Sequence, residues 1–160
     1  MLKCNFFVEG TPRPQPRPRA FSRGGFTRVY DPATAEGWKS QVAIAARPFV
    51  PVARILGPVR VDIHWSFPRP QSHFRTGKHA GELKPNAPRW HTQGRGKNGG
   101  DRDNLDKAIL DALTELRFWK DDGQACAGEL TKKYVVGDEL PGAMIRIEEL
   151  SNAILREMDE

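Results

Sequence analysis

The acidic residues of this sequence include two short motifs whose spacing could bind a metal ion. The stretch GGDRDNLDKAILDALTEL carries Asp101 and Asp103 one residue apart, and FWKDDGQ carries the adjacent pair Asp121 and Asp122. Hard cations such as Mg²⁺ and Mn²⁺ take carboxylate oxygens as ligands and need only a few of them. In nucleases such ions activate water and stabilise the leaving oxygen. We therefore expect these four acids to form a site for Mg²⁺ or Mn²⁺.

Each motif taken alone also has a structural explanation. Asp103 is suited to cap the helix that follows it, with Asp106 three residues on completing a capping box. Asp and Gly are ordinary turn residues, so KDDG is also compatible with a solvated turn. Neither explanation accounts for Asp101, and acids clustered beside a polyanion need a cation between them. The joint metal site is therefore the preferred hypothesis.

The residues between the two motifs predict an amphipathic helix from Asn104 to about Arg117. At about 100° per residue its apolar residues share one face, whereas Lys107 and Asp111 lie on the opposite face. A lysine and an aspartate at positions i and i+4 can form an ion pair. The predicted core face consists of Leu105, Ala108, Ile109, Ala112, Leu113 and Leu116.

The basic residues are concentrated in two loops. The chain has 160 residues, with 25 Lys and Arg against 20 Asp and Glu. Residues 11–28, TPRPQPRPRAFSRGGFTR, contain no acidic residue, and residues 69–100 contain a single one, Glu82. Positive charge gathered in this way favours a polyanionic partner such as nucleic acid. The candidate phosphate-binding residues are Arg13, Arg17, Arg19, Arg23, Arg75, Lys78, Arg95 and Lys97.

The remaining patterns predict a single α+β domain over residues 1–150, with residues 151–160 as a C-terminal tail. Strands are expected over LKCNFFVEG, the alternating GPVRVDIHWSFP, QACAGELTKKYVV and GAMIRIEEL. A first helix is expected from Asp31 to Pro48, and residues 68–100 form a long loop. The predicted fold is thus a mixed, largely antiparallel sheet of about four strands with two main helices.

Composition argues against several classes of protein. No apolar run approaches the roughly 20 residues that span a bilayer, and the N-terminal residues lack a signal-peptide pattern, so we expect a cytoplasmic protein. Cys4 and Cys126 lack metal-ligand spacing and are expected to be buried and reduced. A zinc site is not favoured, because no fixed spacing relates the four histidines, His64, His73, His79 and His91.

Two aromatic residues lie among the basic residues of the long loop. Phe74 and Trp90 could stack on an unpaired base of a nucleic acid, or they could pack the loop onto the body of the domain. The sequence leaves both interpretations open.

Taken together, the motifs resemble the RusA family of Holliday junction resolvases. DRDNLDKAILDAL followed by FWKDDGQ is similar to the family pattern D-x-D-N-L-x-K-x-x-x-D-A-L and D-D-x-Q. GTPRPQPRPRAF and YDPATAEGWKSQV look like the N-terminal segments of the family, and FPRPQSHFRTGKHAGELKPNAPRWHT is similar to a basic stretch of phage-type members. The resemblance touches most of residues 1–125. Gln15 and Arg117 depart from it, because Lys and Gly are usual at these two positions.

The resemblance implies a homodimeric, Mg²⁺-dependent endodeoxyribonuclease of DNA recombination and repair. Such an enzyme resolves four-way DNA junctions by paired, symmetric nicks. By motif position, the metal ligands are Asp101, Asp103, Asp122 and Asp121, and the catalytic residues are Asp101, Asp103, Lys107 and Asp122. Two alternatives stay open: a non-catalytic basic DNA-binding protein, and a nuclease of looser specificity for flaps and forks.

Overall fold

The structure is a computed structural model that describes residues 1–16, 19–30 and 35–153. Its centre is a mixed five-stranded sheet in which β4 pairs antiparallel with β7 and parallel with β5 and β6, while β1 pairs antiparallel with β7. The α+β class is therefore confirmed, with one strand more than expected in the main sheet. The strands are β1 (Lys3–Glu9), β4 (Val59–Phe67), β5 (Ala125–Ala127), β6 (Leu130–Tyr134) and β7 (Gly142–Glu149).

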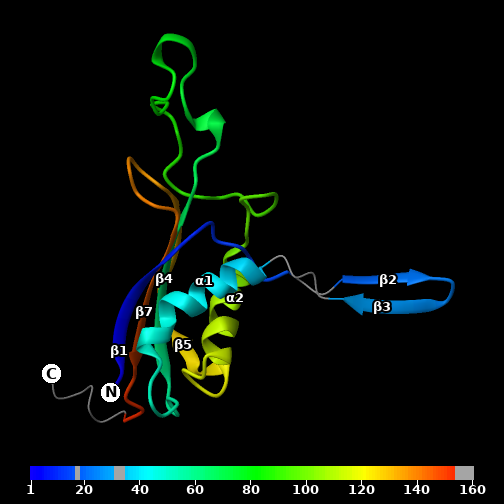
Figure 1. Ribbon diagram of the computed structural model, residues 1–160, viewed down its shortest axis with the longest axis vertical. Helices are drawn as coiled ribbons and strands as arrows, with labels where there is room; N and C mark the ends of the chain where they lie inside the picture. Colours follow the sequence, from blue (N-terminus) through cyan, green and yellow to red (C-terminus); the bar gives the residue numbers. More distant parts are fainter. Residues whose placement is uncertain (17–18, 31–34, 154–160) are drawn as a thin grey trace.

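Two helices, α1 (Glu36–Ala46) and α2 (Arg102–Glu115), pack beside each other on one side of this sheet (Figure 1). A short 3₁₀ turn, η1 (Arg47–Phe49), continues α1. The alternating residues of β4 bury their apolar side chains under the helices, as the sequence pattern predicts. The predicted core face of α2 is also confirmed, because its residues up to Leu113 are buried and Leu116 is half-buried.

Three further expectations concern the two chain segments beside the domain core, the cysteines and membrane insertion. The start of the first helix at Asp31 lies outside the described residues, as does most of the C-terminal tail. Cys4 and Cys126 are both free thiols, but Cys126 is exposed because β5 lies at the edge of the sheet. Among the described residues, no helix is long and apolar enough to cross a membrane.

Gly128 divides the expected strand QACAGELTKKYVV into β5 and β6. A Cβ atom at this position would lie 1.9 Å from the carbonyl oxygen of Val61 in β4. Because only glycine tolerates so close an approach of two backbones, the strand breaks here and resumes after Glu129. This break explains the additional strand of the main sheet.

A second, two-stranded sheet follows the N-terminal Pro-Arg segment and was not predicted. It is an antiparallel hairpin of β2 (Arg19–Arg23) and β3 (Phe26–Tyr30). Gly24 and Gly25 connect the strands with φ angles of 59° and 82°, the left-handed values that a two-residue hairpin turn requires. No strand was expected over residues 19–30, so this hairpin is an addition to the predicted fold.

Residues 68–100, which we call the basic arm, project beyond the end of the main sheet (Figure 1). Two 3₁₀ turns, η2 (Gln71–His73) and η3 (Gly77–His79), lie near its tip, which is closed by a bridge between Phe74 and Leu83. Arg69 fastens its base, because Nε donates to the carbonyl of Val135 and Nη1 donates to that of Pro88, each at 2.7 Å.

Candidate functional site

Helix α2 presents two acids at its N-terminus. It begins at Arg102 instead of Asn104, so Asp101 is the N-cap residue and Asp103 belongs to the first turn. The capping box expected from Asp103 and Asp106 is therefore wrong. Both Asp101 and Asp103 are exposed. The helix dipole favours negative charge at this end.

The side chain of Asp101 lies against the glycine-rich end of the basic arm. It makes no capping hydrogen bond, and a Cβ atom on Gly94 would lie 2.6 Å from its Oδ1. A side chain at position 94 would therefore displace this carboxylate, which is the free end of an exposed side chain. The Asp101 carboxylate thus lies in direct contact with the end of the basic arm.

Lys107 connects α2 to the second acidic motif. Its Nζ lies 2.5 Å from Oδ2 of Asp122 and 2.8 Å from Oδ1 of Asp111. Hydrogen bonds to Asp111 and Asp122 raise the pKa of Lys107, and the same ammonium lowers the pKa of Asp122. The predicted pairing of Lys107 with Asp111 is confirmed. Both Lys107 and Asp122 are therefore charged at neutral pH.

The second motif forms a 3₁₀ turn, η4 (Asp122–Gln124), which Asp121 caps. Oδ1 of Asp121 accepts a hydrogen bond of 2.7 Å from the backbone N–H of Gly123. Asp121 is thus occupied within its own turn, whereas Asp122 faces Lys107. The metal-binding role predicted for Asp121 stays a prediction.

Gln124 fixes this turn to the rest of the fold with four side-chain hydrogen bonds. Its Oε1 accepts from the backbone N–H groups of Lys120 at 2.9 Å and Asp121 at 3.1 Å. Its Nε2 donates to the carbonyls of Ile55 at 3.0 Å and Gly57 at 2.9 Å. The amide thereby clamps the turn that carries Asp122 onto the chain before β4. No role was predicted for Gln124 from the sequence.

Lys132 is a second lysine beside the acids. Its Nζ donates to the carbonyl of Gly100 at 2.6 Å, immediately before Asp101. Burial lowers the pKa of Lys132, and the charge of Asp101 opposes this effect. Lys132 was not predicted as a site residue, although its sequence position carries a signal. Lys132 shares one face of β6 with the apolar Leu130 and Tyr134, where a lysine is unexpected.

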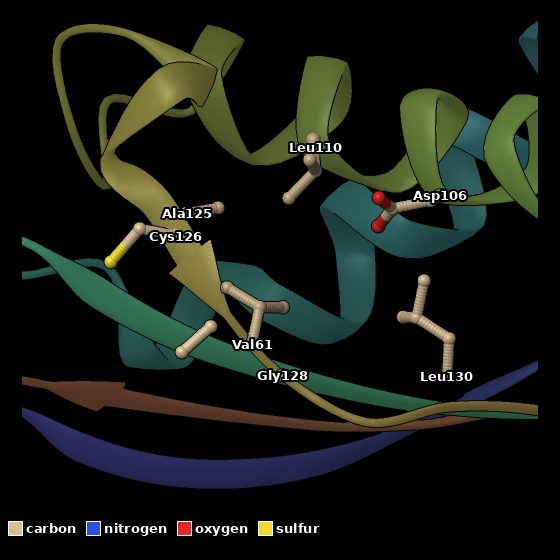
Figure 2. A pocket seen from close by; sticks show the side chains of 8 residues that line it. Val61, Asp106, Leu110, Ala125, Cys126, Gly128 and Leu130 are labelled. Atoms are coloured by element: carbon tan, nitrogen blue, oxygen red, sulfur yellow. The ribbon is translucent and has the colours of Figure 1, made fainter.

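A cleft of about 290 Å³ lies between α2 and the adjoining strands (Figure 2). Asp106 and Leu110 line it from the helix, and Val61 and Leu130 line it from the sheet side. Burial raises the pKa of Asp106, and the nearby charge of Asp122 adds to this effect. Since its lining is otherwise uncharged among the described residues, this cleft does not extend the acidic site.

Five of the eight candidate phosphate-binding residues lie near the N-terminus of α2 or on the basic arm. Arg13 donates to the carbonyl of Lys97, and the N–H of Gln15 donates to the carbonyl of Asn104 at 2.8 Å. The N-terminal segment therefore passes directly beside the acids. Exposed positions are held by Arg75, Lys78, Arg95 and Lys97; Arg19 and Arg23 lie in β2, and Arg17 lies outside the described residues.

The acids are suited by type to a hydrated cation. Among residues 1–16, 19–30 and 35–153, no three His, Cys, Asp or Glu side chains are arranged as a ready-made metal site. Asp101, Asp103 and Asp122 nevertheless offer only carboxylate oxygens from exposed or half-buried positions. Mg²⁺ keeps several waters and binds proteins through one or two such groups. The donor chemistry therefore fits a magnesium ion.

The histidines do not form an alternative site. Nδ1 of His64 lies 2.7 Å from the hydroxyl of Thr131, and His79 lies 3.5 Å from Glu82. His91 is buried and stacks on Phe67. These separate environments give no support to a zinc centre in the described part of the chain.

Comparison with known proteins gives two matches. The family model described as endodeoxyribonuclease RusA matches residues 9–148. The uncharacterized protein YqaN of Bacillus subtilis (strain 168) is 33% identical over 146 residues, which cover 91% of this chain and 96% of that protein. The matched region includes both acidic motifs, Lys107 and the whole basic arm.

Proposed function

Since the chain belongs to the RusA family of endodeoxyribonucleases, we propose that it resolves four-way DNA junctions by Mg²⁺-dependent hydrolysis, with paired nicks in opposed strands. The observation that carries this proposal is the contact of Lys107 with Asp122. It places Asp122 of the second acidic motif beside α2, the helix that carries Asp101 and Asp103 at its N-terminus. The two basic segments, which meet near the N-terminus of α2 where Arg13 contacts Lys97, suit a DNA backbone.

The proposed catalytic residues have distinct tasks. Asp101, Asp103 and Asp122 would hold Mg²⁺, or Mn²⁺ in its place, with Asp121 as a further predicted ligand. When bound, such an ion lowers the pKa of a coordinated water and polarises the phosphate. Lys107 keeps its proton at neutral pH, so it serves as a positive charge for the phosphate oxygens and not as a general base.

DNA binding and symmetry complete the proposal. The basic residues around α2 and on the basic arm would hold backbone phosphates and set the register without reading sequence. Two nicks in opposed strands need two sites related by a two-fold axis, so we propose that the enzyme acts as a homodimer. Sedimentation of the purified protein with and without a junction measures this directly.

Cleavage of a synthetic mobile four-way junction in Mg²⁺ tests the function. We expect paired nicks across the branch point, which are lost in Asp101→Ala and Asp103→Asn while junction binding is kept. Glu115→Gln is the matched control, because it removes one charge from the exposed C-terminal end of the same helix. Junction binding lost in both aspartate variants, with Glu115→Gln unaffected, would contradict the metal role.

Parallel substrates separate the alternatives. Flaps and Y-forks cut as fast as junctions would favour a nuclease of looser specificity. Binding without nicking in either Mg²⁺ or Mn²⁺ would favour a non-catalytic DNA-binding protein. Matched duplex serves as the reference in both comparisons.

A further inference from the structure

All four tryptophans lie within the described residues, and one of them differs sharply from the others. Trp38, Trp65 and Trp119 are at most 3% exposed, whereas Trp90 is 53% exposed. Burial of a large aromatic side chain is strongly favourable. The exposed position of Trp90 in the basic arm therefore calls for an explanation other than packing.

The backbone around Trp90 is fixed. Trp90 forms an antiparallel bridge with Lys133 of β6, and the carbonyl of Arg89 accepts a hydrogen bond of 2.9 Å from the N–H of Tyr134. On the other side, His91 is buried and stacks 3.7 Å from an aromatic ring of β4. The indole is consequently held out from an anchored strand segment. Phe74, the other aromatic candidate of the arm, is half-buried.

The surroundings of Trp90 are positively charged. The guanidinium of Arg89 lies 5.1 Å from the centre of the indole ring. Residues 84–97 contain four basic residues and no acid, and Lys133 lies opposite Trp90 on β6, where it pairs with Glu139 at 3.3 Å. A half-exposed indole with an arginine over one face is a combination that binds nucleobases, because a base can stack on the ring and the cation attracts the phosphate.

We propose that Trp90 and Arg89 form a stacking site for an unpaired nucleobase of a branched DNA. This inference rests on the proposed function and adds a specificity determinant to it. In a continuous duplex the bases are stacked inside and unavailable, whereas a branch point offers bases that cost less to unstack. Trp90 should therefore favour branched DNA over duplex.

The stacking site lies within reach of the acidic site. Gly94, which lies against the carboxylate of Asp101, is only four positions after Trp90 in the sequence. Four extended residues span at most about 14 Å, a distance comparable to a few nucleotides. A base held at Trp90 would thus limit which phosphates can reach the acids.

Tryptophan fluorescence tests the proposal, because the other three indoles are buried. The protein is titrated in EDTA with a four-way junction and with a duplex of the same sequence, while anisotropy of a labelled DNA reports binding separately. We expect the junction to quench the emission and the duplex to leave it nearly unchanged. Trp90→Phe should remove the change in emission and keep junction binding within about threefold, because Phe still stacks.

The matched variants measure specificity. Trp90→Ala should weaken junction binding about tenfold and leave duplex binding unchanged, whereas Lys78→Ala should weaken both alike. Junction binding without quenching would overturn this proposal and leave the proposed nuclease function intact. Emission that changes with protein concentration in the absence of DNA would assign Trp90 to a protein interface instead. Failure to bind any DNA would overturn both proposals.

Discussion

Lys107 Nζ lies 2.5 Å from Oδ2 of Asp122, and this contact joins helix α2 to the turn before β5. Asp111 holds the same ammonium from one helical turn further on, at 2.8 Å. Half of the Lys107 side chain is exposed. The two aspartates thus fix the position of an ammonium group that stays protonated at neutral pH. One side of this group remains accessible to a phosphate.

Replacement of this charge should affect chemistry more than binding. We expect Lys107→Gln to lower the single-turnover rate of junction cleavage by about 100-fold or more, because the amide cannot neutralise charge on the reacting phosphate. Junction binding should change little. Lys3→Gln is the control, because it makes the same chemical change at an exposed position of β1. A near-wild-type rate in Lys107→Gln would remove this residue from the mechanism.

Gln124 should prove essential for the position of Asp122. In Gln124→Glu the acceptor for Lys120 and Asp121 is kept, but an oxygen replaces the donor that binds the carbonyls of Ile55 and Gly57. We expect a loss of about 2 kcal/mol in the free energy of unfolding, measured by urea denaturation. The cleavage rate should also fall at temperatures where the protein is fully folded.

Gln41→Glu provides the comparison for this variant, because it makes the same chemical change at an exposed position of α1. Gln124→Glu should therefore have a lower free energy of unfolding and a lower cleavage rate than Gln41→Glu. Equal stability of the two, or full cleavage activity in Gln124→Glu, would show that the clamp does not position the turn.

The basic arm should contribute to the salt dependence of DNA binding. Each phosphate contact releases counterions, so Lys78→Ala should reduce the slope of log K against log salt by about 1. Arg75 is already paired with Glu82 at 3.3 Å, and Arg75→Ala should reduce the slope less. Anisotropy titrations between low and physiological salt measure both slopes. An unchanged slope in both variants would place the tip of the arm away from DNA.

His91 should make the stability of the fold fall in mild acid. Burial lowers the pKa of His91 below its usual value of 6.5, so the unfolded chain binds a proton that the folded chain resists. The contribution of neutral His91 to the free energy of unfolding is fully present above about pH 6.5, and it is lost as the pH falls towards the folded-state pKa. Urea denaturation of His91→Phe, which keeps an aromatic ring against Phe67, should show a shallower pH dependence in this window.

Part of this pH dependence should survive in the variant. The pKa of His73 is also lowered, chiefly by burial and then by the charges of Arg69 and Lys84. The free energy of unfolding of the double variant His91→Phe and His73→Gln should therefore depend less on pH than that of either single variant. A slope equal to that of the wild type in His91→Phe would show that His91 is protonated without cost in the folded state.

The helices and strands of the fold were largely predictable because they depend on local patterns. The alternation of β4 and the apolar face of α2 were sufficient to place both elements. The hairpin of β2 and β3 was missed although Gly24 and Gly25 offered a turn signal. The break at Gly128 was not predictable, because it depends on the approach of Val61, a residue distant in sequence.

The candidate site also combines features that local sequence patterns predict with features that depend on distant segments. Lys107 and Asp111 were paired correctly from helical spacing, which is a local property. Gln124 and Lys132 were missed because their partners are backbone carbonyls from distant segments. Such partners leave little mark in the sequence, and the one signal for Lys132 was a lysine between Leu130 and Tyr134 along β6.

Arg117 at the C-terminus of α2 should be replaceable by glycine with a gain in stability. Among the described residues it is the only non-glycine residue with positive φ, at 71°. The N–H of Arg117 donates to the carbonyl of Thr114 at 2.9 Å, and that of Phe118 donates to the carbonyl of Leu113 at 3.1 Å. This is the Schellman arrangement, whose left-handed residue is usually Gly.

Arg117→Gly should therefore relieve about 1–2 kcal/mol of left-handed strain, partly offset by the greater freedom of glycine in the unfolded chain. We expect a net gain of about 0.5–1 kcal/mol in urea denaturation, with unchanged cleavage because Gln124 still fixes the turn of Asp122. Arg117→Ala removes the charge without relieving the strain and should be close to neutral. Equal gains in both variants would show that charge, and not backbone conformation, disfavours arginine at this position.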